Sequence, residues 1–357
     1  MAELLSTSPG DIERAGRALR EGLLVAFPTE TVYGLGAKAT DTHALARVFE
    51  AKRRPTFDPL IVHIAEVDAL ATVADLSQLA ADRRELVQRL ISALWPGPLT
   101  LILPKQPSIP DLATSGLSTA AVRLPAHPVA QALIRAAGVP VAAPSANPFG
   151  YLSPTRAEHV LKQLGDRVDF IIDGGRCSVG VESTVLDMSG DTISILRPGG
   201  LPRERIEAII GPVHQIDRST AHPTAPGQLP SHYAPRASLS LFPLGEIPLQ
   251  GWSDSEPVAC LFFDEASRSR WLSAYSRLHT GTDSAGSPLP ESRVLSPSGS
   301  LLEAAANLFD VLHELDALGV ARILAERVPD RDLGPAINDR LYKARGEAKG
   351  RTGHSST

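Results

Sequence analysis

The stretch LLVAFPTETVYGLG at residues 23–36 carries the pattern that decides the fold. Its first five residues are apolar and indicate a buried strand, which the following proline ends. Hydroxyl and carboxylate side chains come next at 29–31, and two glycines then allow a backbone to approach a ligand closely. Because ligand sites in α/β proteins form where strands end, the stretch indicates a site as well as a strand. A hydroxyl-rich turn without a ligand is the alternative interpretation.

The same order of an apolar strand followed by a polar segment or a helix recurs along residues 1–211. Strands are predicted at 23–27, 59–64, 99–104, 120–125, 140–145, 170–175, 183–188 and 192–198, and helices at 8–21, 41–52, 82–94, 128–137 and 155–164. The first helix begins with a cap at Ser8 and a proline, and it ends at Gly22. Strands outnumber helices too far for a simple doubly wound sheet. The sequence therefore predicts an α/β fold with a large, twisted, mixed sheet and helices packed on it.

Residues 212–236 lose this periodicity and are rich in proline, as is typical of a linker. Strands then return at 238–244, 258–263, 294–296 and 322–328, alternating with helices at 266–278, 300–318 and 335–345. This order predicts a second, small, open parallel α/β domain of Rossmann-like type. We therefore expect domains at 1–211 and 237–346, a linker at 212–236, a mobile loop at 280–290 and a flexible tail at 347–357.

The composition of the 357 residues is that of an ordinary globular protein, with 43% hydrophobic and 21% charged residues. The formal net charge of −5 argues against a general polyanion binder, because nucleic-acid affinity comes mainly from neutralising phosphates. Cys177 and Cys260 form no C-x-x-C pair, which favours a reducing compartment. The N-terminus lacks the pattern of a signal peptide, and no apolar run has the length of a membrane span, so we expect a cytoplasmic protein.

Four cations stand at the ends of predicted strands or helices, namely Lys52, Arg54, Arg123 and Arg197. Together they indicate a pocket for a multiply charged anion such as a nucleoside triphosphate. The chain has no P-loop or dinucleotide fingerprint, and its ten histidines show no ligand spacing, so we expect no metal site built from side chains. Plainer interpretations also stand: Lys52 and Arg54 complement a helix dipole, and His63 is an ordinary core histidine.

Seven motifs, in order, carry a family resemblance: PTETVYGLG at 28–36, K-x-R at 52–54 followed by PLIVHI, LWPGPLT at 94–100, VRLP at 122–125, APSAN at 143–147, ESTV at 182–185 and LRPG at 196–199. Together they resemble the YrdC-like domain of threonylcarbamoyl-AMP synthases. HYAP at 232–235 and the later GPAINDRLYKA resemble the long, two-domain form of that enzyme. The resemblance thus covers nearly the whole chain.

This resemblance implies a nucleotidyltransferase that joins L-threonine, bicarbonate or CO2, and ATP into threonylcarbamoyl-adenylate and pyrophosphate. A separate complex in the family then transfers the group to the adenosine beside the anticodon of tRNAs that read codons starting with A. The implied cofactor is Mg2+, brought with ATP. Neither a membrane nor direct sequence-specific binding of nucleic acid is expected.

The resemblance also implies the residues of the site. Threonine would be held by Thr31, His63, Arg123, the backbone of Ala143, and Ser183. ATP would be held by Arg54, Asp58, Thr119, Ser145, Asn147, Ser153, Arg197 and Tyr233. Lys52 and Arg54 are the expected catalytic pair, because the reacting partners are anionic and must be aligned against their mutual repulsion. Asp58 departs from the family, in which Asn is frequent there, and a carboxylate repels phosphates unless Mg2+ or an arginine intervenes.

The linker at 212–236 is expected to fold back as a lid over the pocket. It carries Tyr233, an aromatic residue with a polar tip, whose hydroxyl would reach the nucleotide phosphates. The alternative is a solvated hinge whose tyrosine only packs between the domains.

Two other functions stay open. An RNA-binding or ribosome-associated module would use the same cations, although the net charge of −5 and the 5% aromatic content offer it little. A carbamoyltransferase acting on carbamoyl phosphate would use the same domain, although such proteins usually carry zinc-finger or acylphosphatase-like domains for which this chain has no sequence.

Overall fold

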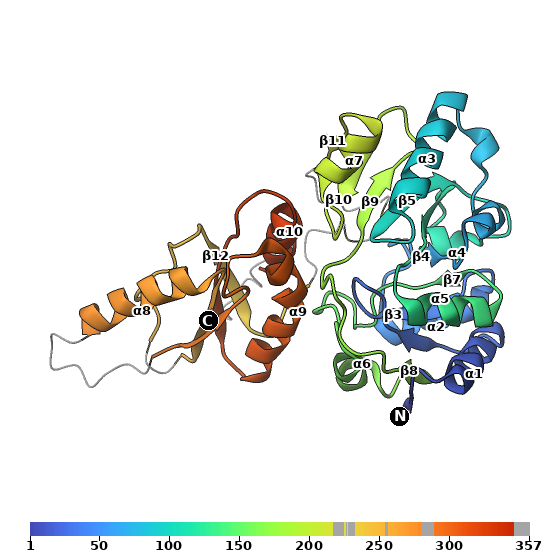
Figure 1. The fold of residues 1–357 in the computed structure, drawn as a ribbon. Helices are drawn as coiled ribbons and strands as arrows, with labels where there is room; N and C mark the ends of the chain where they lie inside the picture. The colour runs from blue at the N-terminus through green and yellow to red at the C-terminus, as the bar shows by residue number, and fades with distance from the viewer. Residues whose placement is uncertain (217–224, 226, 228–232, 254–255, 280–288, 346–357) are drawn as a thin grey trace, which may run out of the picture.

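The computed structural model describes residues 1–216, 225, 227, 233–253, 256–279 and 289–345. They form two lobes that lie side by side, residues 1–216 and residues 237–345 (Figure 1). The expected tail, most of the loop expected at 280–290 and most of the linker expected at 212–236 lie outside the described residues. Among the described helices, none is both long and apolar enough to cross a membrane.

Within the described residues, eleven strands of the first lobe form one mixed sheet in the order β1-β8-β2-β3-β7-β4-β6-β5-β9-β10-β11. These strands are β1 (Glu3–Leu5), β2 (Val25–Phe27), β3 (Gly34–Lys38), β4 (Ile61–His63), β5 (Leu99–Pro104), β6 (Thr119–Arg123), β7 (Val141–Ala142), β8 (Phe170–Ile172), β9 (Thr184–Asp187), β10 (Ser194–Arg197) and β11 (His214–Gln215). Parallel pairs such as β4 with β6 stand beside antiparallel pairs such as β5 with β6. The predicted mixed sheet is confirmed.

Helices cover both faces of the sheet around β2. Val25 and Phe27 pack against α1 (Pro9–Arg20) and α5 (Pro128–Ala137), whereas Ala26 packs against α2 (Thr42–Lys52) and α6 (Ala157–Leu164). This is the alternation that a strand imposes on its side chains. The lobe also contains α3 (Ala81–Leu94), α4 (Asp111–Thr114), α7 (Arg203–Ile210) and two 3-10 helices, η1 (Val67–Thr72) and η2 (Leu76–Gln78).

The other half of the sheet has two different faces. Helices α3 and α7 pack on one face, over Leu101 of β5 and Ile195 of β10. Its opposite face carries Ile61, Ile102, Ala121, Val185 and Leu196, on which Ala225 packs. A residue from the region between the lobes therefore lies directly on the sheet.

The second lobe is a three-layer unit around a parallel sheet of order β12-β15-β13-β14. Its elements are β12 (Ser238–Phe242), β13 (Val258–Phe262), α8 (Glu265–His279), β14 (Glu291–Val294), α9 (Leu301–Ala317), β15 (Arg322–Glu326) and α10 (Gly334–Ala344). Ala259 and Leu261 of β13 belong to the cluster under α9 and α10, whereas Cys260 and Phe262 belong to the cluster under α8. The predicted open parallel sheet is confirmed.

Helices α9 and α10 lie on the side of the second lobe that faces the first (Figure 1). One hydrophobic cluster continues across the contact and joins Val32 and Val181 to Leu308 and Phe309 of α9. A methyl group at Gly180 would lie 2.4 Å from the carbonyl oxygen of Ala305, so a glycine is needed for this close approach. The two lobes therefore share a core.

The sequence predicted the long helices and also the short strands β2, β4, β7 and β8, but it did not predict β1, β3, β11, α4 or α7. The side chain of Ser8 caps α1 and Gly22 follows it with φ of 84°, as predicted. Strand β3 reads GLGAK, and its two glycines have low strand propensity, so the segment was interpreted only as a loop near a ligand. Pairing with β2 and β7 makes it a strand, which is a tertiary effect.

Helices α1 and α5 cross closely at Gly16, where an added methyl carbon would lie 2.7 Å from the carbonyl carbon of Ala136. We predict that Gly16→Ala lowers the free energy of unfolding by about 1–3 kcal/mol, because the helices must separate. Gly10→Ala in the same helix is the control, since no atom lies within 4 Å of a methyl group there. The control is expected to be neutral or stabilising by up to about 1 kcal/mol. Urea unfolding measures both, and equal effects would contradict the close crossing.

Candidate active site

A cavity of about 540 Å³, its open mouth included, lies in the first lobe beside the ends of several strands of the sheet. It is bordered by the segments that follow β2 and β7, by those that precede β4 and β9, by β4 itself, and by the last residues of β6 and β10. Nine of the residues expected to bind ligands line it: Thr31, Arg54, His63, Arg123, Ala143, Ser145, Ser183, Arg197 and Tyr233.

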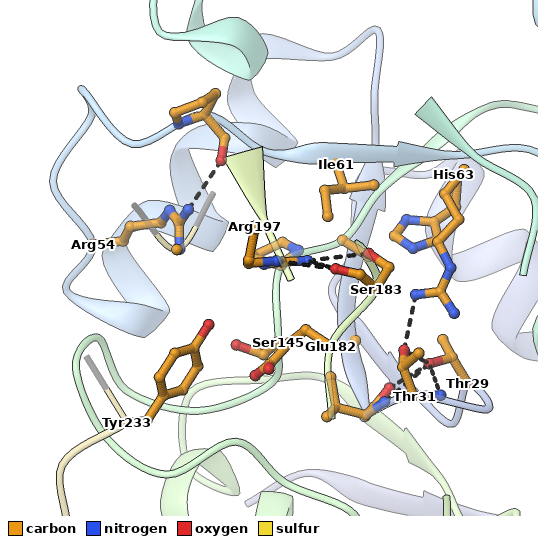
Figure 2. A pocket seen from close by; sticks show the side chains of 17 residues that line it. Thr29, Thr31, Arg54, Ile61, His63, Ser145, Glu182, Ser183, Arg197 and Tyr233 are labelled. Carbon is orange, nitrogen blue, oxygen red and sulfur yellow. Dashed lines mark hydrogen bonds between the residues drawn. The ribbon is translucent and has the colours of Figure 1, made fainter. Parts of the chain in front are cut away.

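The cavity has two chemically different ends (Figure 2). Arg54 and Tyr233 lie at one end, and His63, Thr29 and Thr31 lie at the other. Ser183 lies between them, beside Arg197. The residues expected to hold ATP and those expected to hold threonine are thus largely separated within one cavity.

Two cations at the end of α2, Lys52 and Arg54, point in different directions. Arg53 has φ of 52°, and this left-handed residue turns the chain between Lys52 and Arg54. Lys52 is 1% exposed, and its Nζ donates hydrogen bonds to the backbone oxygens of Ser145 and Asn147. Burial, together with the nearby Arg54, holds the pKa of Lys52 well below its usual range. Lys52 does not line the cavity but supports the turn that presents Ser145.

Arg54 forms a short local structure with the loop after it. Its Nε and Nη2 donate hydrogen bonds to the backbone oxygens of Asp58 and Pro59, at 3.1 and 2.9 Å. Its Nη2 also lies 2.8 Å from Oδ2 of Asp58, which is fully buried. Burial raises the pKa of Asp58, and the positive charge of Arg54 opposes that rise. Asp58 therefore acts on the cavity through Arg54, because it is not itself among the lining residues.

At the opposite end, Arg123 connects two segments of the cavity wall. Its Nη2 lies 2.6 Å from Oε1 of Glu30, and its Nη1 donates a 2.8 Å hydrogen bond to Oγ1 of Thr31. His63 stands opposite Arg123 in the pairing of β4 with β6 and is 3% exposed. Burial, reinforced by the charge of Arg123, lowers the pKa of His63 to about 3. His63 is therefore neutral at physiological pH.

Arg197 and Ser183 are held together at the centre of the cavity. Arg197 donates hydrogen bonds from Nε and Nη2 to the backbone oxygen of Ser183, and from Nη2 to its hydroxyl. The Ser183 hydroxyl also shares a 2.7 Å hydrogen bond with Thr100. The serine is thus fixed in orientation at the boundary between the two ends.

Two described residues from the region between the lobes complete the wall. Gly227 has φ of 84°, and a methyl group there would lie 2.9 Å from Cδ of Arg197 and 3.0 Å from the hydroxyl of Tyr233. Tyr233 is 1% exposed, and burial raises the pKa of its hydroxyl. Both residues line the cavity, while most of the lid expected over 212–236 lies outside the described residues.

Glu182 brings a carboxylate to the cavity wall. It accepts hydrogen bonds from the hydroxyl of Ser153 and, at 2.6 Å, from Nε of Arg340 on α10. Burial acts to raise the pKa of Glu182, but the neighbouring guanidinium groups of Arg340 and Arg197 outweigh it and keep this pKa below its usual range. The carboxylate is therefore ionised and paired.

The remaining expected residues do not line the cavity. Ser153 is buried behind Glu182, and Asn147 donates hydrogen bonds to the backbone oxygens of Pro148 and Tyr151. Thr119 begins β6, four residues from Arg123 and so about 13 Å along the strand. Within the described residues, no group of three or more histidine, cysteine, aspartate or glutamate side chains is arranged to hold a metal ion.

Sequence reasoning assigned no role to several lining residues, among them Thr29, Pro59, Pro144, Glu182 and Gly227. Glu182 belongs to the ESTV motif. The sequence feature that could have identified it as a site residue is a carboxylate directly before a predicted buried strand. Arg340, which pairs with it, lies 158 residues away, and no local pattern connects the two. That contact follows only from the docking of the lobes.

The fold and the cavity define a two-lobed α/β protein with a buried, arginine-lined pocket. A family model of the Sua5, YciO and YrdC proteins, described as telomere recombination, matches residues 17–199, and a model described as the threonylcarbamoyl-AMP synthase C-terminal domain matches residues 201–346. The chain belongs to the threonylcarbamoyl-AMP synthase family, in its two-domain form, and is an enzyme of the nucleotidyltransferase type.

Relatives agree over nearly the full length. The threonylcarbamoyl-AMP synthase of Bacillus subtilis is 42% identical over 348 residues, covering 96% of this chain and 95% of its own. That of Schizosaccharomyces pombe is 36% identical and covers 93% and 88%. A crystal structure of Pyrococcus abyssi Sua5 complexed with L-threonine superposes with a TM-score of 0.81 at 38% identity, covering 97% of this chain and 98% of that one.

Because the pKa of His63 is depressed, the free energy of unfolding decreases as the pH falls. Below about pH 6.5 an unfolded histidine binds a proton that the folded His63, with a pKa of about 3, does not bind. Folding is therefore weakened as the pH falls, by about 1.4 kcal/mol per pH unit and about 2 kcal/mol by pH 5. We predict that this loss, measured by urea unfolding from pH 7.5 to 5, is absent in His63→Gln. Parallel pH curves for the two proteins would contradict a buried neutral His63.

Proposed function

We propose that the cavity synthesises threonylcarbamoyl-adenylate from L-threonine, bicarbonate or CO2, and ATP, with release of pyrophosphate. The observation that carries this proposal is that one cavity has an end with two guanidinium groups, those of Arg54 and Arg197, and an end where the single guanidinium of Arg123 lies beside Thr31 and His63, with Ser183 between the two ends. A reaction that links a small polar amino acid to a polyanionic nucleotide needs both ends at once. The complex of Pyrococcus abyssi Sua5 with L-threonine supports threonine as a substrate.

ATP is proposed to lie at the end formed by Arg54, Arg197, Ser145 and Tyr233. Both arginines are buried, at 7% and 4% exposure, so their attraction for phosphate is screened little by water. Charge-assisted hydrogen bonds from such groups are roughly twice as strong as neutral ones. The hydroxyls of Ser145 and Tyr233 would add neutral contacts to the phosphates.

Threonine is proposed to lie at the end formed by Thr31, His63, Arg123 and the backbone of Ala143, with its reacting amine toward Ser183. Arg123 supplies the charge for its carboxylate. Its partner Glu30 fixes the guanidinium plane, since the two are only 2.6 Å apart. Neutral His63 donates or accepts a hydrogen bond without adding a charge.

The chemistry is then one of alignment and charge. The deprotonated threonine amine adds to CO2 and gives up a proton to solvent to form a carbamate, and a carbamate oxygen then attacks the α-phosphorus in line as pyrophosphate leaves. The carbamate, the threonine carboxylate and the triphosphate are all anionic, so the fixed guanidinium groups of Arg54 and Arg197 lower their repulsion and hold the geometry. Lys52 is proposed to act one step away, by holding the turn of Ser145 and Asn147 in place. The enclosed site limits hydrolysis of the carbamate and of the mixed anhydride.

Mg2+ is proposed to enter with the triphosphate, where it screens the phosphate charge. The carboxylates nearest to the cavity are already paired with arginine, Asp58 with Arg54 and Glu182 with Arg340. They are therefore suited to orient arginines rather than to hold an ion. The product is proposed to pass, in the cytoplasm, to a separate complex that modifies the tRNA adenosine beside the anticodon.

The test is incubation of the purified protein with ATP labelled at the γ-phosphate, bicarbonate and Mg2+, with and without L-threonine. We expect release of labelled pyrophosphate only when threonine is present. A carbamoyltransferase would instead depend on carbamoyl phosphate, and an RNA-binding module would release none. Absence of threonine-dependent release would reject the proposed reaction.

The division of the cavity predicts a split effect of two matched arginine substitutions. Arg123→Lys is expected to raise the KM for threonine at least about tenfold with little change for ATP, because lysine cannot form the forked contacts of a guanidinium. Arg54→Lys is expected to do the reverse. Steady-state kinetics with each substrate varied in turn measures both. Equal losses for the two substrates in either variant would contradict the assignment of the ends.

A further inference from the structure

The side chain of Arg340, in the second lobe, contacts residues that line the cavity of the first lobe. It lies on α10, is 0% exposed, and is one of the largest fully buried side chains of the described chain. Its Nε is 2.6 Å from Oε2 of Glu182, and its Nη1 donates a 3.0 Å hydrogen bond to the backbone oxygen of Pro198, the neighbour of Arg197. Its guanidinium also lies over the ring of Tyr233, 5.1 Å from the centroid.

Arg340 is itself held in place by its own helix. Nη1 of Arg340 lies 2.6 Å from Oδ2 of Asp339, and Asp339 also pairs with Lys343 one turn further on. Lys343 donates a 2.7 Å hydrogen bond to the backbone oxygen of Gly227, another residue of the cavity wall. One face of α10 thus touches two residues that line the cavity, Glu182 and Gly227, and also Pro198, which neighbours the lining residue Arg197.

The carboxylate of Glu182 would weaken the binding of an anion in this cavity unless a positive charge compensates it. Its carboxylate lines the cavity and is 6% exposed, so water cannot screen it well. An uncompensated carboxylate there would repel a triphosphate. The groups that face it are the guanidinium groups of Arg340 and Arg197 and the hydroxyl of Ser153, and Arg340 makes the close ion pair.

We infer that Arg340 is a positioning residue of the second lobe that neutralises Glu182 and thereby allows the anionic nucleotide to enter the first lobe's cavity. This inference rests on the proposed function, since it takes the nucleotide end of the cavity as given. It assigns the second lobe a part in substrate binding, because that lobe supplies the guanidinium that forms the close ion pair with Glu182.

Arg340→Met removes the charge and keeps an apolar side chain. The expected result is a rise of at least about tenfold in the KM for ATP, with less than about threefold for threonine, because the repulsion acts on the triphosphate. Adding Glu182→Gln to the same protein removes the uncompensated carboxylate. It is expected to bring the KM for ATP back to within about threefold of the wild type. A merely structural arginine predicts no such rescue.

Arg176→Met is the matched control at the same contact between the lobes. Arg176 pairs with Asp310 of α9 at 2.7 Å and is not part of the cavity wall. It is expected to leave the KM for ATP unchanged, whatever it does to stability. An equal rise in the control would overturn the inference, because any weakening of the docking would then suffice.

Two further measurements keep the inference testable if Arg340→Met does not fold. The first is Arg340→Lys, which keeps the charge and is expected to hold the KM for ATP within about fivefold of the wild type. A larger rise would count against neutralisation.

The second is calorimetric binding of a non-hydrolysable ATP analogue, which needs no turnover. It is applied to the wild type, Arg340→Lys and the Arg340→Met/Glu182→Gln double variant. Analogue binding that is equally lost in the lysine and double variants overturns the inference. A wild type that binds the analogue but releases no pyrophosphate overturns the proposed reaction alone.

Discussion

Every charged side chain buried around the cavity needs a partner, and this constraint ties distant parts of the structure together. Arg54 has Asp58, Arg123 has Glu30, and Glu182 has Arg340, at 2.8, 2.6 and 2.6 Å. Removing one partner from a buried pair strands the other charge, at a typical cost of about 3–5 kcal/mol. The site is therefore assembled as pairs, and each pair fixes the orientation of the group that faces the ligand.

The partners of these ion pairs lie at different separations along the chain, and this explains the arrangement of the two lobes. Arg54 finds its partner four residues away in the same loop, whereas Arg123 joins β6 to the segment after β2. Glu182 finds its partner only on α10, in the other lobe. Because α9 also packs on Val181 and Gly180, the second lobe rests directly beside the carboxylate that it pairs with. The second lobe thus pairs with a carboxylate that lines the first lobe's cavity, although none of the described residues of that lobe lines the cavity itself.

The sequence predicted those parts of the site whose chemistry is local. Apolar runs located the strands, and polar residues at their ends placed Thr31, Arg123 and Arg197 in one cavity. The sequence pattern did not reveal the position of Lys52, whose side chain bonds to backbone oxygens outside the cavity lining because Arg53 adopts a left-handed conformation, and its catalytic role stays a prediction. It also could not find the pair of Glu182 and Arg340, because no propensity or spacing encodes a contact between lobes. Local patterns therefore gave the elements, while docking and buried-charge pairing gave the rest.

The central claim is that one cavity holds the nucleotide and the amino acid at opposite ends of a paired-charge frame. A crystal structure with L-threonine and a non-hydrolysable ATP analogue bound together tests it most directly. The account predicts the triphosphate against Arg54 and Arg197, and the amino acid beside Thr31, His63 and Arg123, with its nitrogen toward the α-phosphorus. A triphosphate bound elsewhere, such as between β10 and α10, or the two ligands competing for the same end, would contradict the account.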